Sequence, residues 1–143
     1  MGLTAAVVAV TLAGCGSTTL SAHAVRTRAA LLCTTAIRRS DKIAMPSSTS
    51  AGAAFLAKGI TVFGSEVQAL HKLAPPHELA SAYRTALSTA TQQLDALIAT
   101  EHDLRAGGDP VIAIKQLDLE LGPINARDRQ AWRAVGVPDC IDR

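Results

Sequence analysis

The chain has 143 residues, enough for one domain, and a formal net charge of +2 at pH 7. Aromatic residues make up only 3% of the chain: Phe55, Phe63, Tyr83 and Trp132. Because sugar and single-stranded nucleic acid sites rely on aromatic stacking, and nucleic acid binding is favoured by a larger positive charge, the composition argues against both classes.

The first residues of the chain have the pattern of an export signal. An apolar run of about ten residues ends at Ala13, Gly14 and Cys15; it has the length of a signal-peptide core and is too short to cross a bilayer. Small residues before a Cys, behind such a run, resemble the lipobox of bacterial lipoproteins. Unlike the usual pattern, Met1 and Gly2 bring no Lys or Arg ahead of the run.

The lipobox resemblance implies cleavage before Cys15 and attachment of lipid to its sulfur. The protein would then be anchored to the cell membrane, on its extracytoplasmic face. We therefore expect a signal peptide at residues 1–14, a flexible tether at 15–21 and a helical bundle domain at 22–143.

Assigning Cys15 to lipid leaves Cys33 and Cys140 as an even pair of cysteines in an oxidising compartment. We interpret them as a disulfide that joins the first helix to the last residues of the chain. In the chain-entropy model a loop of roughly 100 residues gives up to ~4.7 kcal/mol of stability. The alternative, a thiol nucleophile or a metal ligand, has no nearby combination of His and acid to support it.

Two helices are predicted in the first half of the domain, at residues 22–39 and 51–73. The first has a stripe of apolar residues at helical spacing: Val25, Ala29, Leu32 and Ala36. The second has a heptad-like stripe, although glycines leave open which of its sides faces the core: Leu56, Ile60, Phe63, Val67 and Leu70. Between the two helices, Pro46 and a run of Ser and Thr predict a loop.

Two longer helices are predicted in the second half, at residues 76–105 and 110–135. Pro75 and Pro76 separate the first of them from the preceding helix by a tight turn, which predicts an antiparallel hairpin. Asp109 and Pro110 have the chemistry of a helix start. Gly122 and Pro123 are expected to kink the last helix or to divide it in two. Together the four predicted helices indicate an all-α, antiparallel four-helix bundle whose short first helix is tied to the C-terminus by the disulfide.

The chain resembles a loose group of small, uncharacterised actinobacterial helical lipoproteins. The shared marks are short and scattered: Cys15, Cys33, Leu70 with residues 73–76, the turn at Gly108 and Asp109, and residues 136–140. The resemblance implies a disulfide-closed bundle on the cell surface and carries no activity.

Several polar residues could form a site. His71, His77 and Glu78 could meet at the proline turn, and zinc needs at least three protein ligands; His102 is about 37 Å further along its helix and cannot join them. We therefore favour exposed polar residues at a turn, with Glu78 favourable at a helix N-terminus. An early basic cluster could attract an anionic membrane or could be a solvated helix face: Arg26, Arg28, Arg38, Arg39 and Lys42.

Three further side chains have two interpretations each. Glu101 lies on an apolar stripe and is either a functional acid or a helix-end carboxylate that reaches water or an Arg. The same two interpretations apply to Asp128. Trp132, the only tryptophan, either packs around the disulfide or contacts a ligand or partner.

No sequence motif of catalysis is present: the chain lacks a Gly-x-Ser-x-Gly elbow, a phosphate-binding glycine-rich loop with Lys, and a His-Glu-x-x-His pair. We expect no catalytic residues, no metal and no cofactor. The leading hypothesis is a non-enzymatic cell-envelope lipoprotein that presents a helical surface to a protein partner or to the cell wall. The alternative is an extracytoplasmic carrier or sensor that holds an apolar small molecule between its helices.

Overall fold

The structure is a computed structural model that describes residues 19–141. The predicted signal peptide, Cys15 and most of the predicted tether lie outside the described residues. Within them the chain forms four long helices and two short 3-10 turns, in the order α1 Ala22–Ser40, η1 Thr49–Ala51, α2 Gly52–His71, α3 His77–Arg105, α4 Pro110–Val135 and η2 Pro138–Cys140.

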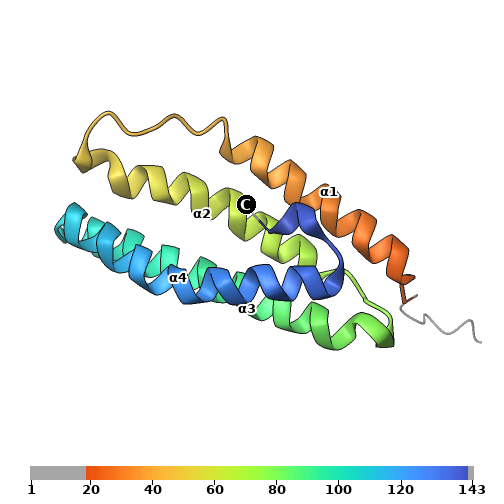
Figure 1. The fold of residues 1–143 in the computed structure, drawn as a ribbon. Helices are drawn as coiled ribbons and strands as arrows, with labels where there is room; N and C mark the ends of the chain where they lie inside the picture. Colours follow the sequence, from red (N-terminus) through yellow and green to blue (C-terminus); the bar gives the residue numbers. More distant parts are fainter. Residues whose placement is uncertain (1–18, 142–143) are drawn as a thin grey trace, which may run out of the picture.

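The four helices lie side by side and alternate in direction along the chain (Figure 1). This confirms the all-α four-helix bundle. We call the end where α1 and α3 begin the proximal end, and the end where α2 and α4 begin the distal end. The most extensive helix contacts are those of α3 with α4 and of α2 with α3. None of the helices between residues 19 and 141 is both long enough and apolar enough to cross a membrane.

The helix starts follow from their capping residues. The Ser21 hydroxyl accepts a hydrogen bond from the backbone N–H of Ala24 at 3.1 Å, at the start of α1. The Asp109 carboxylate accepts hydrogen bonds from the first N–H groups of α4, at Val111 and Ile112, with Pro110 in the first turn. The predicted Asp-Pro helix start is therefore confirmed, and it satisfies N–H groups that have no partner within the helix.

The hairpin between α2 and α3 has slightly different bounds from those expected. Helix α2 ends at His71, because the next two N–H groups form tighter i→i+3 hydrogen bonds, Lys72 to Ala69 and Leu73 to Leu70. Pro76 has extended backbone angles and caps α3 from outside the helix. A residue that precedes a proline is disfavoured in the α conformation, which explains why no helix continues through Pro75 and Pro76.

Helix α4 runs unbroken through Pro123, so the expectation that Gly122 and Pro123 divide it is wrong. A proline removes the hydrogen bond to the carbonyl four residues earlier, here that of Leu119. Both Leu119 and Pro123 are exposed, so this carbonyl lies on the solvent side of the helix, where water can replace the lost bond.

The hydrophobic core is concentrated at the proximal end of the bundle. Its buried residues come from all four helices and from the C-terminal turn: Val25, Ala29, Cys33, Leu70, Leu79, Tyr83, Ala86, Ala131, Trp132, Val135, Val137 and Cys140. The Cys33–Cys140 disulfide is present, with 5.2 Å between the Cα atoms, and it fixes η2 against α1. The predicted pinning of the first helix to the C-terminus is thus confirmed.

Candidate functional site

Trp132 lies inside the proximal core, with 0% of its surface exposed. Its ring packs edge to face against Tyr83, with the ring centroids 5.9 Å apart. It shares the core with both cysteines of the disulfide. Of the two interpretations open from the sequence, the structure therefore places Trp132 in core packing, away from any surface that a partner reaches.

The polar residues singled out in the sequence do not assemble into one site. His71, His77 and Glu78 are exposed, and His71 Nε2 lies 3.5 Å from Thr91 Oγ1. Glu101 forms an ion pair with Arg105 one turn further along α3. Across residues 19–141 no group of three or more His, Cys, Asp or Glu side chains is placed to hold a metal ion.

The basic residues of α1 lie on exposed surface: Arg26, Arg28, Arg38, Arg39 and Lys42. Arg26 nevertheless has a structural contact, because its Nε donates a hydrogen bond to the Val135 carbonyl at 2.8 Å. It therefore caps the C-terminal end of α4, where a positive charge is favourable.

Asp128 is buried and does not pair with its neighbour Arg127. The Thr89 hydroxyl on α3 donates to Asp128 Oδ1 at 2.7 Å, which ties α3 to α4. Arg127 is exposed and donates instead to Gln92 Oε1 at 3.0 Å. The Asp128 carboxylate, 1% exposed, thus takes part in a buried hydrogen bond between helices and does not face water.

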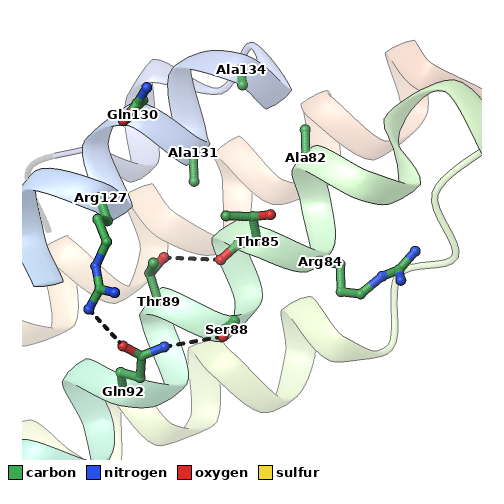
Figure 2. Close-up of a pocket in the computed structure, with 10 residues that line it drawn as sticks. All are labelled: Ala82, Arg84, Thr85, Ser88, Thr89, Gln92, Arg127, Gln130, Ala131 and Ala134. Atoms are coloured by element: carbon green, nitrogen blue, oxygen red, sulfur yellow. Dashed lines mark hydrogen bonds between the residues drawn. The ribbon is translucent and has the colours of Figure 1, made fainter.

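A polar groove of about 700 Å³ lies between α3 and α4. In Figure 2 the Arg127 side chain reaches Gln92, and Gln92 donates in turn to Ser88 at 3.2 Å. The Arg84 side chain points away from these three residues. Small residues form the rest of its wall, among them Ala82, Ala131 and Ala134. Among the described residues that line the groove there is no Cys, His or carboxylate, so none of them forms a nucleophile paired with a base. It is best explained as the polar outer edge of a close helix contact.

A second groove, of about 530 Å³, lies at the distal end and is largely apolar. The loop after α1 contributes Met45 and Pro46, α2 contributes Phe55 and Leu56, and α3 contributes Leu104. Helix α4 closes it with Val111, Ile114, Lys115 and Asp118. Exposed apolar side chains extend this surface along α4: Val111 is 71% exposed, and Ile112 and Leu119 are exposed on the adjoining face.

A third pocket, of about 280 Å³, is lined by residues from all four helices. Its polar groups are Ser40, Glu66, Gln93 and Asn125, and Gln93 Nε2 donates to Asn125 Oδ1 at 2.8 Å. Glu66 is only 4% exposed although it is charged in its usual state. A Glu side chain is almost never so buried unless it is paired.

Sequence reasoning missed both the distal groove and the pocket around Glu66. A signal for the groove exists: Val111 and Ile112 follow the Asp-Pro start of α4 and lie outside the stripe that the core needs. Glu66 directly precedes Val67 of the predicted apolar stripe, so it lies near the boundary of the core face, and periodicity alone does not place such a residue inside or outside.

Comparison of the chain with protein-family models, with curated proteins and with solved structures found no match.

Proposed function

We propose that the protein is a non-enzymatic lipoprotein of the cell envelope, anchored through lipid on Cys15, whose distal groove binds a partner protein. The observation that carries this proposal is the position of the groove. It lies at the end of the bundle opposite to the one from which the N-terminal segment leaves.

The first described residues fix the exit point of that segment. The backbone N–H of Leu20 donates to the Ala74 carbonyl at 3.0 Å, in the turn between α2 and α3 at the proximal end. Helix α3, with 29 residues, spans about 44 Å from this end to the other at 1.5 Å per residue. A lipid anchor on Cys15 would therefore hold the proximal end near the membrane and leave the distal groove accessible.

The chemistry of the groove suits a protein segment with an apolar face. Exposed apolar patches on monomeric proteins are usually small, and larger ones rimmed by polar residues mark interaction sites. Here the apolar floor has Lys115 and Asp118 at its edge. An amphipathic helix that inserts two or three apolar side chains would bury Val111 and Met45, which are otherwise exposed to water.

The anchor is tested by replacing Cys15 with Ser in the producing cell. We expect the wild-type chain in the membrane fraction and the Cys15→Ser chain in the soluble fraction, because the variant has no sulfur to carry the lipid. Retention of Cys15→Ser in the membrane fraction, at the wild-type level, would contradict the lipoprotein proposal.

The groove is tested by crosslinking in intact cells, with a photo-reactive residue in place of Lys115. Val111→Glu should lower the yield of the crosslinked partner about tenfold, because it places a charge on the apolar floor. Glu is favourable in the first turn of a helix, so this variant should keep its fold. Leu31→Glu is the matched control, since Leu31 is 62% exposed on α1 and lies outside the groove. An equal loss in both variants would place the partner elsewhere.

We infer a second candidate function, that of an extracytoplasmic carrier or sensor of an apolar small molecule. It is favoured by a different observation, the third pocket, which residues of all four helices line.

A further inference from the structure

The polar groove between α3 and α4 contains two arginines that no acidic side chain neutralises. Arg84 of α3 and Arg127 of α4 both line it, and no Asp or Glu is among the described residues of its lining. Neither arginine forms an ion pair within residues 19–141. Asp128, the neighbour of Arg127 in the sequence, is 1% exposed and accepts the Thr89 hydroxyl, so it is not open to a ligand in the groove. The two positive charges are therefore available to an anion.

The Arg127 side chain is held in place by a series of hydrogen bonds along α3. Its Nη2 donates to Gln92 Oε1 at 3.0 Å, and Gln92 Nε2 donates to Ser88 Oγ at 3.2 Å (Figure 2). A guanidinium has five N–H donors in a planar fork, so a single bond leaves most of them unused. Because a side chain that is already ordered loses less freedom on binding, this arrangement prepares the guanidinium for a ligand.

The groups that remain free in this part of the groove are mostly hydrogen-bond donors. The Gln92 side-chain oxygen is occupied by Arg127, and the Ser88 oxygen accepts from Gln92, which leaves the Ser88 hydroxyl hydrogen free to donate. Gln130 lines the groove from α4, and its amide has no hydrogen bond to another residue of the described chain. A ligand here must therefore accept several hydrogen bonds at once.

A phosphate group matches these donors better than a carboxylate does. A phosphate ester has a charge of about −1.5 to −2 at neutral pH and three strong acceptor oxygens, whereas a carboxylate has two oxygens. An arginine can bind phosphate through two parallel N–H···O bonds. The Arg127 fork, the Ser88 hydroxyl and the Gln130 amide together can serve all three oxygens.

Arg84 adds a second positive charge at the other end of the groove. Arg84, Ser88 and Gln92 are spaced four residues apart on α3, so they follow one face of the helix. Positions 84 and 92 are about 12 Å apart along the helix axis. The Arg84 side chain points away from Arg127 in Figure 2. Two cations separated in this way suit a ligand with two anionic groups better than a single small ion.

We propose that the polar groove binds a ligand with two phosphate groups, one at Arg127, Ser88 and Gln130 and the other at Arg84. The close contact of α3 with α4 accounts for the alanines of the groove and does not require its arginines. The inference goes beyond both proposed functions, and it does not depend on the lipid anchor, on the distal groove or on the third pocket.

The test measures the binding of fructose bisphosphate, fructose monophosphate and fructose by titration calorimetry at neutral pH and low ionic strength, where salt screens the charges least. The whole chain is used, with its disulfide oxidised and with Cys15→Ser so that no lipid is attached. We expect the bisphosphate to bind at least about tenfold more tightly than the monophosphate. Fructose should give no measurable binding.

Two variants assign the binding to this groove. Arg127→Gln should weaken both phosphate compounds by about tenfold or more, whereas Arg84→Gln should bring the bisphosphate to within about twofold of the monophosphate. Arg129→Gln is the matched control, because it removes the same charge from an exposed position of α4 outside the groove. It should change each affinity by less than about twofold. Circular dichroism checks that each variant is folded.

The phosphate groups can belong to a soluble compound or to neighbouring lipid headgroups. The same variants are therefore sedimented with vesicles of phosphatidylglycerol, with phosphatidylcholine vesicles as the reference. Sedimentation that falls in Arg127→Gln and in Arg84→Gln, and not in Arg129→Gln, assigns the groove to lipid phosphate. Equal sedimentation of all variants, together with the expected calorimetry, assigns it to a soluble ligand.

Three results would overturn the inference. Equal losses in Arg127→Gln and Arg129→Gln in both assays would reduce the interaction to the overall charge of the molecule. Equal affinity of the unsubstituted groove for the bisphosphate and the monophosphate, with no dependence of vesicle binding on Arg84, would exclude a ligand with two phosphates. Failure of both phosphate compounds at millimolar concentration and of the anionic vesicles would leave the groove without a phosphate ligand.

Discussion

At the scale of single residues, Tyr83 of α3 is buried and contacts both neighbouring helices, α2 and α4. Its hydroxyl donates to the Leu70 carbonyl at 2.8 Å, so the start of α3 is tied to the end of α2. Its ring lies against Trp132 of α4. Burial raises the pKa of the Tyr83 hydroxyl, because the charged phenolate is poorly solvated in the core.

The raised pKa predicts a loss of stability at alkaline pH. The folded chain holds the Tyr83 proton more tightly than the unfolded chain, whose tyrosine ionises near pH 10. The stabilisation is therefore complete below about pH 10 and falls as the pH rises further. Because Tyr83 is the only tyrosine, tyrosinate absorbance reports it directly. It should appear only together with the loss of helical circular dichroism. Ionisation near pH 10 with the helices intact would contradict this environment.

Single side chains could be placed from the sequence only where their contacts have a local signal. Trp132 could be assigned to the core as one of two alternatives, because a lone tryptophan near a predicted disulfide has an obvious place to pack. Asp128 could not be placed, since its hydrogen bond is to Thr89 of another helix, 39 positions earlier in the chain. Pairings between helices of this kind leave no periodic trace in the sequence.

At the scale of the elements, the end of α4 depends on the backbone of Gly136. This residue has φ +82°, in the left-handed region, and its N–H bonds to the carbonyls of Trp132 and Arg133. A Cβ atom there would approach Arg26 Nε to 3.0 Å, and Arg26 holds the Val135 carbonyl. The cap thus joins the end of α4 to α1.

Gly136→Ala is therefore expected to destabilise the bundle by about 1–2 kcal/mol, through the left-handed backbone alone, with a further loss if Arg26 must move. Gly59→Ala is the matched control, because it lies inside a helix with open space around it; it should stabilise by about 0.5–1 kcal/mol. Urea unfolding followed by circular dichroism measures both. Changes of the same sign in the two variants would show that the backbone of Gly136 is not the cause.

The helices themselves were predictable, and their ends were predictable where capping chemistry is local. Asp109 with Pro110 marks the start of α4 correctly, because the cap uses neighbouring residues only. Of the two outcomes expected at Gly122 and Pro123, a kink or a division of the helix, the division does not occur, because water can replace the hydrogen bond that Pro123 removes. Whether Pro123 faces water is decided by the packing of the whole bundle.

At the scale of the whole molecule, the two ends of the bundle differ. The proximal end holds the large buried side chains and the disulfide, whereas the distal end exposes Met45, Val111 and Ile112. An apolar surface left open at one end, in a chain with a well-filled core at the other, is consistent with a division between a stabilising end and a binding end.

The disulfide should stabilise α1 more than the other helices. Cys33 and Cys140 are 107 positions apart in the sequence. Helix α1 makes its most extensive contacts with α2 and with η2, the turn that carries Cys140. Reduction frees a long loop, which costs up to ~4.7 kcal/mol in the chain-entropy model. Helix α1 then has only its non-covalent contacts, while α3 and α4 keep their larger shared interface.

Reduced protein, or the Cys33→Ser variant, should therefore lose amide protection first in α1 and η2, as measured by hydrogen exchange with mass spectrometry, while α3 and α4 stay protected. Cys140→Ser should give the same pattern, since either change opens the same bond. Intact mass checks the starting state, which must gain two hydrogen atoms on reduction. If protection instead falls equally in all four helices, the bundle opens as one cooperative unit, and the disulfide stabilises the whole molecule rather than the first helix.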